Sequence, residues 1–197
     1  MAFDLAALEQ RGERVGAARN LTKAEVWRVR DGERTVVVKT LATRPAIARF
    51  LLGGFLLRRE GRMMARLRGT PGIPDLIEAT STALVVEWRP GRTLFDLRKT
   101  GISEETGRRI EAVVAAVHER GYAHGDIGRR DVLVADDGSV SLLDFATAVG
   151  PGCPPLLWRL LLPIWRGRDA SRCGKMIRRY RRRWDRNVAR RTATGPS

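Results

Sequence analysis

The stretch HGDIGRRD, residues 124–131, brings His124, Asp126 and Asp131 together, and another acid, Asp144, follows in the sequence DFA. Carboxylate oxygens are ligands that Mg²⁺ prefers, and an aspartate can also accept a proton from a hydroxyl group. Glycine, aspartate and arginine are equally common in ordinary turns. Chemistry at this loop therefore requires partner residues elsewhere in the chain.

A lysine and a glutamate lie where apolar residues are expected. In VVVK, strand alternation places Lys39 on the same face as Val37 and Leu41. A helical period over residues 56–67 places Glu60 in an apolar stripe. The other members of that stripe are Leu56, Met63, Met64 and Leu67. Buried charges need partners, so we expect an ion pair between Lys39 and Glu60. The alternative is two unrelated charges that extend to solvent.

The segments around these residues have the patterns of strands and helices. Asp31-Gly32 and Asp137-Gly138 each separate two β-rich runs, which predicts two hairpins. Two further strands are expected within residues 76–94, and a helix is expected from Ser103 to Arg120. The buried face of that helix is predicted to be Ile110, Val113, Val114 and Val117.

In order, the chain has a strand lysine, a helix glutamate, two strands, a helix, the HGD loop, a hairpin and DFA. In this order it resembles the protein-kinase-like superfamily, over roughly residues 20–150. Within it, the chain most resembles the small bacterial lipopolysaccharide-core sugar kinases and their RIO-type relatives. The resemblance implies an α+β, bilobal fold with a β-rich N-lobe and a reduced helical C-lobe. The expected parts are an N-terminal helical extension (1–18), the N-lobe (19–88), the C-lobe (89–165) and a basic amphipathic helix and tail (166–197).

The resemblance also implies chemical roles, with ATP and Mg²⁺ as cofactors. Lys39 would hold the ATP phosphates, and Glu60 would hold Lys39 in place. Asp126 would orient the acceptor hydroxyl and accept its proton. Asp144 and Asp131 would bind Mg²⁺.

Four further residues match positions around the adenine base in this family. Val37 and Leu133 match the apolar positions above and below the ring. Glu87 and Trp88, in VVEW, match the segment between the lobes whose backbone meets the adenine edge.

Several positions depart from the family pattern. Asp131 stands where these kinases usually have asparagine, and residues 18–27 have no glycine-rich loop. Gly128 stands where a lysine is often found, so Arg130 or Arg129 would bring positive charge to the transferring phosphate. The alternative for both arginines is an ordinary solvated loop residue. These departures leave open a second function, a pseudokinase that binds nucleotide and a partner.

The basic charge is concentrated near the C-terminus. The chain has a formal net charge of +15, of which residues 166–191 carry +10. Their aromatic and apolar residues recur at helical spacing, and the apolar stretch before them is too short to span a membrane. Such a segment can pack on the C-lobe or lie on an anionic membrane; binding to nucleic acid is the less favoured alternative.

The start of the chain has no signal-peptide pattern, and Cys153 and Cys173 are too few for a disulfide framework. We expect unreactive thiols in a cytoplasmic protein, peripheral at the inner face of the bacterial cytoplasmic membrane. The expected function is an ATP- and Mg²⁺-dependent phosphotransferase that acts on a hydroxyl of a sugar or lipid-linked sugar. The alternatives are the pseudokinase and a RIO-like Ser/Thr kinase whose basic tail contacts RNA.

Overall fold

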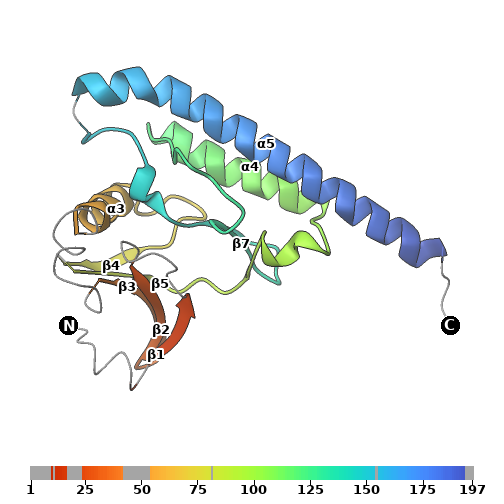
Figure 1. Ribbon diagram of the computed structural model, residues 1–197, viewed down its shortest axis with the longest axis horizontal. Helices are drawn as coiled ribbons and strands as arrows, with labels where there is room; N and C mark the ends of the chain where they lie inside the picture. Colours follow the sequence, from red (N-terminus) through yellow and green to blue (C-terminus); the bar gives the residue numbers. More distant parts are fainter. Residues whose placement is uncertain are drawn as a thin grey trace. The chain divides into compact units, whose positions relative to one another are not determined.

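The computed structural model describes residues 10, 12–16, 24–41, 54–80, 82–153 and 155–193 (Figure 1). The fold is a mixed α/β arrangement that divides into two compact units. The first unit comprises residues 1–69 and 74–88, and the second comprises residues 70–73 and 89–197. The arrangement of these units as two lobes stays a prediction.

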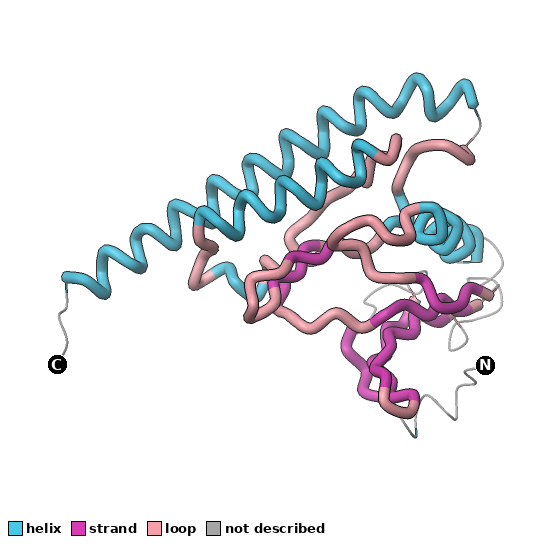
Figure 2. Tube along the Cα trace, turned by 180° about the vertical axis from the view of Figure 1, so that it is seen from behind, coloured by secondary structure: helices cyan, strands magenta, loops and turns pink. Residues whose placement is uncertain are grey.

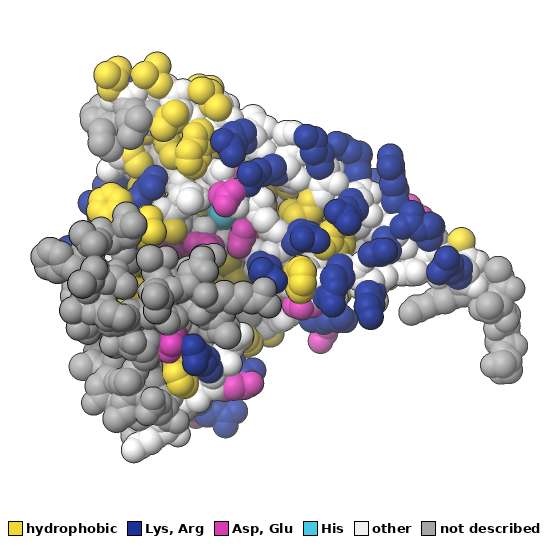
Figure 3. Space-filling view, viewed as in Figure 1, with side chains coloured by type: hydrophobic (Ala, Val, Ile, Leu, Met, Phe, Trp, Pro, Cys, Tyr) yellow, Lys and Arg dark blue, Asp and Glu magenta, His cyan; other side chains and the backbone are white. Residues whose placement is uncertain are grey.

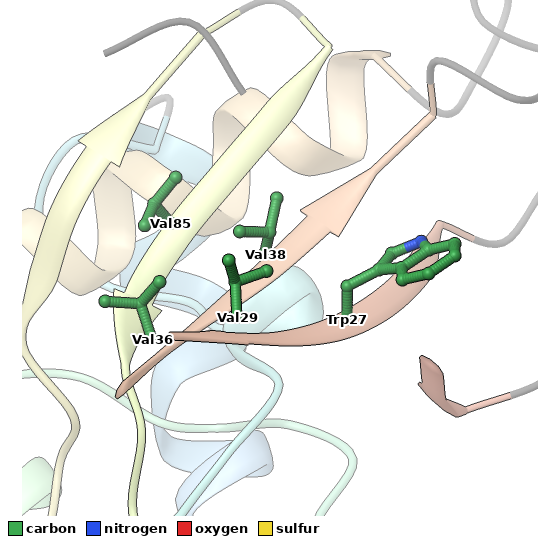
Figure 4. Close-up of a cluster of buried hydrophobic side chains, with 5 residues drawn as sticks. All are labelled: Trp27, Val29, Val36, Val38 and Val85. Atoms are coloured by element: carbon green, nitrogen blue, oxygen red, sulfur yellow. The ribbon is translucent and has the colours of Figure 1, made fainter. Parts of the chain in front are cut away.

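The first unit contains an antiparallel sheet with the strand order β1-β2-β3-β5-β4. Its strands are β1 (Gly12–Gly16), β2 (Glu25–Asp31), β3 (Arg34–Thr40), β4 (Leu76–Ala79) and β5 (Ala83–Glu87). The predicted hairpin is formed by β2 and β3, and Gly32 in its turn has φ of +62°. Alternate residues of three strands form a buried apolar cluster (Figure 4): Trp27, Val29, Val36, Val38 and Val85.

Helix α3 (Gly54–Arg66) packs against β4 and β5. Gly61 permits this close approach, because a Cβ there would lie 3.0 Å from the Cβ of Ala79. The predicted stripe is correct for Glu60, Met63, Met64 and Leu67, all of which are buried. It is wrong for Leu56, which is 37% exposed, because Leu57 at 4% exposure takes the inward position of that turn.

The prediction of a helical extension over residues 1–18 is wrong for residues 12–16, which form β1. This strand pairs with β2, from Gly12 opposite Val29 to Gly16 opposite Val26. The pairing satisfies backbone groups along an edge of β2 that would otherwise be open. Apart from residue 10, the rest of the predicted extension lies outside the described residues.

The second unit is built around two helices that lie side by side (Figures 1 and 2), α4 (Glu104–Glu119) and α5 (Pro155–Ala193). The backbone N–H of Thr106 donates to the side chain of Ser103, which caps α4 as predicted. The four apolar residues predicted for the inner face of α4 are all buried. A small sheet packs beside α4 and consists of β6 (Arg92–Thr93), β7 (Val132–Val134) and β8 (Val140–Leu142).

The predicted boundary between residues 165 and 166 does not exist, because the single helix α5 crosses it. Cys173, Ile177 and Tyr180 of α5 are buried at helical spacing. Burial, with Glu111 and Asp169 nearby, raises the pKa of the Cys173 thiol to about 12, as expected of an unreactive cysteine. The basic segment is therefore partly a packed element of the second unit. Farther along, Trp184 and Val188 are 39% and 43% exposed.

The loop before α4 meets α5 at Gly101. This glycine has φ of +82°, and a Cβ added to it would lie 2.5 Å from the backbone nitrogen of Trp184 and the carbonyl oxygen of Tyr180. Replacing Gly101 by alanine therefore imposes both backbone strain and a collision with helix backbone, which cannot rotate away.

We predict that Gly101→Ala lowers the free energy of unfolding by about 2–4 kcal/mol, from left-handed strain plus overpacking. The midpoint of thermal unfolding should fall by roughly 5–15 °C. Gly138→Ala is the matched control: its φ is +79°, but the added Cβ would meet only the end of the Arg109 side chain. Equal losses in the two variants would contradict the close packing of this loop on α5.

Candidate functional site

The lysine and the glutamate of the first unit form the predicted ion pair. The ammonium group of Lys39 on β3 donates to the carboxylate of Glu60 on α3. The side chains are 19% and 5% exposed, respectively, so the pair is largely shielded from water. Val37, two residues earlier on the same face of β3, is half-buried. The pair therefore fixes the lysine at the sheet surface.

Glu87 and Trp88 lie at the end of β5. The backbone N–H of Glu87 donates to the carbonyl of Asp75 at 2.9 Å, and that of Trp88 donates to the carbonyl of Thr35 at 3.3 Å. The Arg28 guanidinium lies over the Trp88 ring, 5.3 Å from its centroid. The N–H of Trp88 is thus engaged by the protein, and the adenine contact stays a prediction.

The HGD loop of the second unit is fixed through its histidine. His124 is 2% exposed, and its Nε2 lies 2.8 Å from the carbonyl oxygen of Leu143, so this nitrogen must carry the proton. The ring also packs edge-on against Phe145, with centroids 5.0 Å apart. The hydroxyl of Thr147 donates to the carbonyl of His124 at 3.0 Å. The loop is therefore tied to the segment that carries Asp144.

Only glycine fits at the second position of this loop. Gly125 has φ of +88°, and a Cβ there would lie 1.9 Å from the Trp165 ring and 3.0 Å from the carbonyl oxygen of Thr147. The close approach brings α5 directly against the loop. The histidine and glycine of HGD thus shape the loop that presents Asp126.

One functional residue, Asp169 on α5, was missed by the sequence analysis. Its carboxylate is fully buried and accepts the backbone N–H groups of His124 at 2.7 Å and Gly125 at 2.9 Å. The Nε2 of His118 lies 3.2 Å from the same carboxylate. Asp169 thus positions the HGD loop by holding its backbone against α5. An acid within an arginine-rich helix is ordinarily solvated, so the sequence pattern gave no indication of this role.

The surroundings of Asp131 in the second unit shift its pKa. Burial, followed by the charge of Asp144, raises the pKa of Asp131, and Asp126 adds a smaller contribution in the same direction. The charge of His124 and the hydrogen bond from the Gly128 N–H oppose this increase. The pKa of Asp131 rises mainly because burial disfavours its ionised form, and the neighbouring carboxylates add to this effect.

The backbone at Asp144 is strained. Its φ and ψ are 65° and 71°, and it is the one non-glycine residue with positive φ among the described residues. The N–H of the preceding residue, Leu143, donates to the carbonyl of Asp131 at 2.7 Å. Strained backbone held by its surroundings is typical of functional sites. Here it orients Asp144 beside the segment of Asp131.

Asp126 is exposed and pairs with the Arg172 guanidinium of α5. Arg130 lies over the Phe95 ring at 4.4 Å from the centroid, and Arg129 lies over the same ring at 5.6 Å. Their proposed contact with a transferring phosphate stays a prediction. Leu133 is half-buried on β7 opposite Ser141.

The predicted site residues fall into two groups. The first unit holds Lys39, Glu60, Val37, Glu87 and Trp88; the second holds Asp126, Arg130, Asp131, Leu133 and Asp144. In the described part of the chain, no group of three or more His, Cys, Asp or Glu side chains could hold a metal ion. Asp131 and Asp144 nevertheless fit Mg²⁺, which uses one or two carboxylates together with water and substrate phosphates. A cation would also offset the repulsion that raises the pKa of Asp131.

Comparison with known proteins shows similarity to protein kinases. The chain is 32% identical to CBL-interacting protein kinase 12 of Oryza sativa subsp. japonica over 65% of this chain and 25% of that protein. It is 28% identical to CBL-interacting serine/threonine-protein kinase 7 of Arabidopsis thaliana over 71% of this chain and 34% of that protein. A putative serine/threonine-protein kinase of Bacillus subtilis is 24% identical over 45% of this chain and 42% of that protein. No family model matches the chain.

These relatives support a protein-kinase-like superfamily for the chain. Protein kinases transfer phosphate and generally use ATP and Mg²⁺. The chain spans only about a quarter or a third of the two plant kinases. Particular likeness to lipopolysaccharide-core or RIO-type kinases is not confirmed by these comparisons.

Asp169→Asn should disturb the HGD loop, because its amide NH₂ would face one of the backbone N–H donors. We predict a loss of about 2–3 kcal/mol in the free energy of unfolding. The kcat of phosphoryl transfer should fall about 10–100-fold through misplacement of Asp126, with little change in KM for Mg²⁺-ATP. Asp185→Asn, an exposed position on the same helix, is the control. If the two variants have the same stability and the same kcat, Asp169 does not position the HGD loop.

Proposed function

We propose that the protein is an ATP- and Mg²⁺-dependent phosphotransferase that acts on a hydroxyl group of a sugar or glycolipid. The observation that carries this proposal is the hydrogen bonding that ties the segments of Asp126, Asp131 and Asp144 together. His124 reaches the carbonyl of Leu143, and the N–H of Leu143 reaches the carbonyl of Asp131. Three carboxylates on segments held in this way suit metal-assisted phosphoryl transfer.

Each carboxylate has a distinct proposed task. Asp131 and Asp144 would hold Mg²⁺, which when bound neutralises phosphate oxygens. Asp126 is 62% exposed and is therefore accessible to an acceptor hydroxyl, whose proton it would accept. Arg172 pairs with Asp126 and would hold this side chain in place. In the other unit, Lys39, held by Glu60, would bind nucleotide phosphates.

A small acceptor is favoured over a protein substrate by the connection that follows Asp144. Only residues 148–154 separate the 3₁₀ helix Phe145–Thr147 from the start of α5. A peptide substrate requires an extended docking surface beside the catalytic aspartate, and this connection is too short to form one. A sugar hydroxyl needs less protein surface, so it agrees better with the short connection.

A membrane-bound acceptor is supported by the surface of α5. Its first half exposes Leu156, Leu160 and Ile164, which lie four residues apart and so share one helix face. The following part of α5 carries a high density of arginines, seen as dark-blue side chains in Figure 3. Apolar and basic surface on one helix suits the interface of an anionic membrane. Among the described residues, no helix is long and apolar enough to cross a bilayer.

The catalytic assignment is tested by comparing two aspartates. Asp126→Asn should lower kcat for phosphoryl transfer about 10²–10⁴-fold, because the proton acceptor is lost, while Mg²⁺-ATP still binds. Asp144→Asn should also weaken nucleotide binding in the presence of Mg²⁺, as measured by calorimetry. Asp136→Asn, an exposed residue of the adjacent hairpin, is the control.

Full turnover by Asp126→Asn would reject the assigned role of Asp126. If the unmodified protein binds Mg²⁺-ATP but transfers no phosphate to water, sugar, lipid or protein, the nucleotide-binding pseudokinase is the better description.

The membrane proposal is tested by co-sedimentation with vesicles. Binding should rise with the fraction of anionic lipid and fall with salt, because each basic residue near the surface contributes about 1 kcal/mol. Replacing Leu156, Leu160 and Ile164 by glutamine should reduce binding by roughly tenfold or more, since apolar burial is lost. Glutamine substitutions at Phe55 and Ile77, exposed apolar residues of the first unit, provide a control. Equal binding to neutral vesicles, or an equal loss in the control, would contradict the proposed interface.

A further inference from the structure

A concave, arginine-rich surface adjoins the HGD loop. One cavity of about 230 Å³ is lined by Tyr180 and five arginines: Arg98, Arg129, Arg179, Arg183 and Arg186. A second cavity of about 340 Å³ shares Arg129, Arg179 and Tyr180 with the first and extends along the loop to Arg172. We call these two cavities together the arginine groove. None of the described residues that line it is an aspartate or glutamate.

Three arginines of the groove are held in place by neutral groups. The Arg183 guanidinium donates to the carbonyl of Arg98, and the Arg98 guanidinium donates to the carbonyl of Phe95 at 3.1 Å. Arg129 lies over the ring of Phe95. Carbonyl oxygens and an aromatic face orient a guanidinium without cancelling its charge. The groove therefore has positioned positive charge that the protein itself does not neutralise.

Two further arginines of the groove also lack a carboxylate partner among the residues that the structure describes. Arg179 and Arg186 are exposed and have no carboxylate partner within the described parts of the chain. By contrast, Arg181 on the side of α5 that faces α4 pairs with Glu104 at 2.8 Å, and Arg109 on α4 pairs with Glu105 at 3.0 Å. Among the described residues, Arg172 is the groove arginine that pairs with a carboxylate, that of Asp126. The other groove arginines therefore provide positive charge for an external anion.

The groove is connected to the proposed catalytic aspartate. Arg172 lines its second cavity, and the guanidinium of the same residue pairs with Asp126. A molecule whose hydroxyl lies at Asp126 would therefore have Arg172 beside it and the groove beyond. Planar guanidinium groups match the geometry of phosphate oxygens, and a concave basic surface concentrates its field on an anion.

We propose that the arginine groove binds a phosphate group that the acceptor already carries, so that the substrate of this protein is a phosphorylated molecule. This inference rests on the proposed function. It extends that function by specifying the chemistry of the acceptor: a phosphate ester in addition to the reacting hydroxyl. The groove fixes the acceptor by this ester, and Asp126 receives the hydroxyl proton.

Single-stranded RNA is the other anionic occupant to consider, and the groove suits it less well. Such binding depends on aromatic side chains on which bases stack. The ring of Phe95 is covered by Arg98, Arg129 and Arg130, whose guanidinium carbons lie 4.4–5.6 Å from its centroid. The aromatic residue that lines the groove, Tyr180, is 3% exposed. The groove thus offers charge without a stacking surface.

The groove is tested first with inorganic phosphate, by calorimetry without metal or nucleotide. The protein should bind phosphate, and Arg179→Gln with Arg186→Gln should weaken this binding about tenfold or more. The matched control is Arg159→Gln with Arg168→Gln, which removes the same charge from exposed positions of α5 outside the groove. Absent binding, or equal losses in both double variants, would overturn the proposal.

The source of the phosphate is tested by competition. If glucose 6-phosphate displaces inorganic phosphate and glucose does not, the ligand is a water-soluble phosphate ester. If only vesicles containing phosphatidic acid displace it, the ligand is a lipid headgroup. Both results support the groove, provided that the Arg179/Arg186 variant abolishes the effect. Groove-dependent binding of a single-stranded RNA oligonucleotide, with neither phosphate ester competing, would replace this proposal by an RNA contact.

Turnover separates failure of the groove from failure of the proposed function. With a phosphorylated acceptor, the Arg179/Arg186 variant should raise the acceptor KM about tenfold and leave KM for Mg²⁺-ATP unchanged. Phosphate binding in the groove without transfer from Mg²⁺-ATP to any acceptor would reject the proposed function, and with it the assignment of that phosphate to an acceptor. Transfer from Mg²⁺-ATP that is unaffected by loss of the groove would reject the groove alone.

Discussion

The second unit depends on the buried carboxylate of Asp169. This group accepts the N–H groups of His124 and Gly125, which lie 45 and 44 residues earlier in the sequence, and it lies beside His118. A buried carboxylate costs several kcal/mol unless its oxygens are saturated with donors. The loop N–H groups need the Asp169 carboxylate as their acceptor, and the buried carboxylate needs these N–H groups as its donors. Packing of α5 and formation of the loop are therefore mutually dependent.

Further hydrogen bonds connect the loop held by Asp169 to the segments of Asp131 and Asp144. Ala123 and Val149 exchange two hydrogen bonds of 2.8 Å, and His124 reaches the carbonyl of Leu143. The N–H of Leu143 in turn reaches the carbonyl of Asp131. The strained backbone of Asp144 is tolerated because the residues on both sides of it are fixed in this way. The positions of the proposed metal-binding carboxylates thus depend on α5, which supplies neither of them.

The sequence was informative where a local pattern was broken by a charge. Lys39 and Glu60 stood out because each interrupted an apolar period, and the structure pairs them. Asp169 could not be recognised, because an acid among arginines fits the pattern of a solvated helix and only the packing of α5 on α4 buries it. The strand β1 was missed for a similar reason. Its sequence GERVG has weak alternation, and it becomes a strand by pairing with β2.

Asp169 and Arg172 lie three residues apart on α5, so one helical turn presents both. Asp169 is buried and accepts a hydrogen bond from the backbone of the HGD loop, whereas Arg172 pairs with the exposed carboxylate of Asp126. The basic charge of this helix is therefore not a separate tail but part of the surroundings of the loop. Beyond Arg172, the groove arginines Arg179, Arg183 and Arg186 lie along the same helix. Opposite charges interact strongly only within a Debye length of about 8 Å. An anion bound in the groove would compete with Asp126 for Arg172, so binding in the groove would be coupled to the mobility of the proposed catalytic carboxylate.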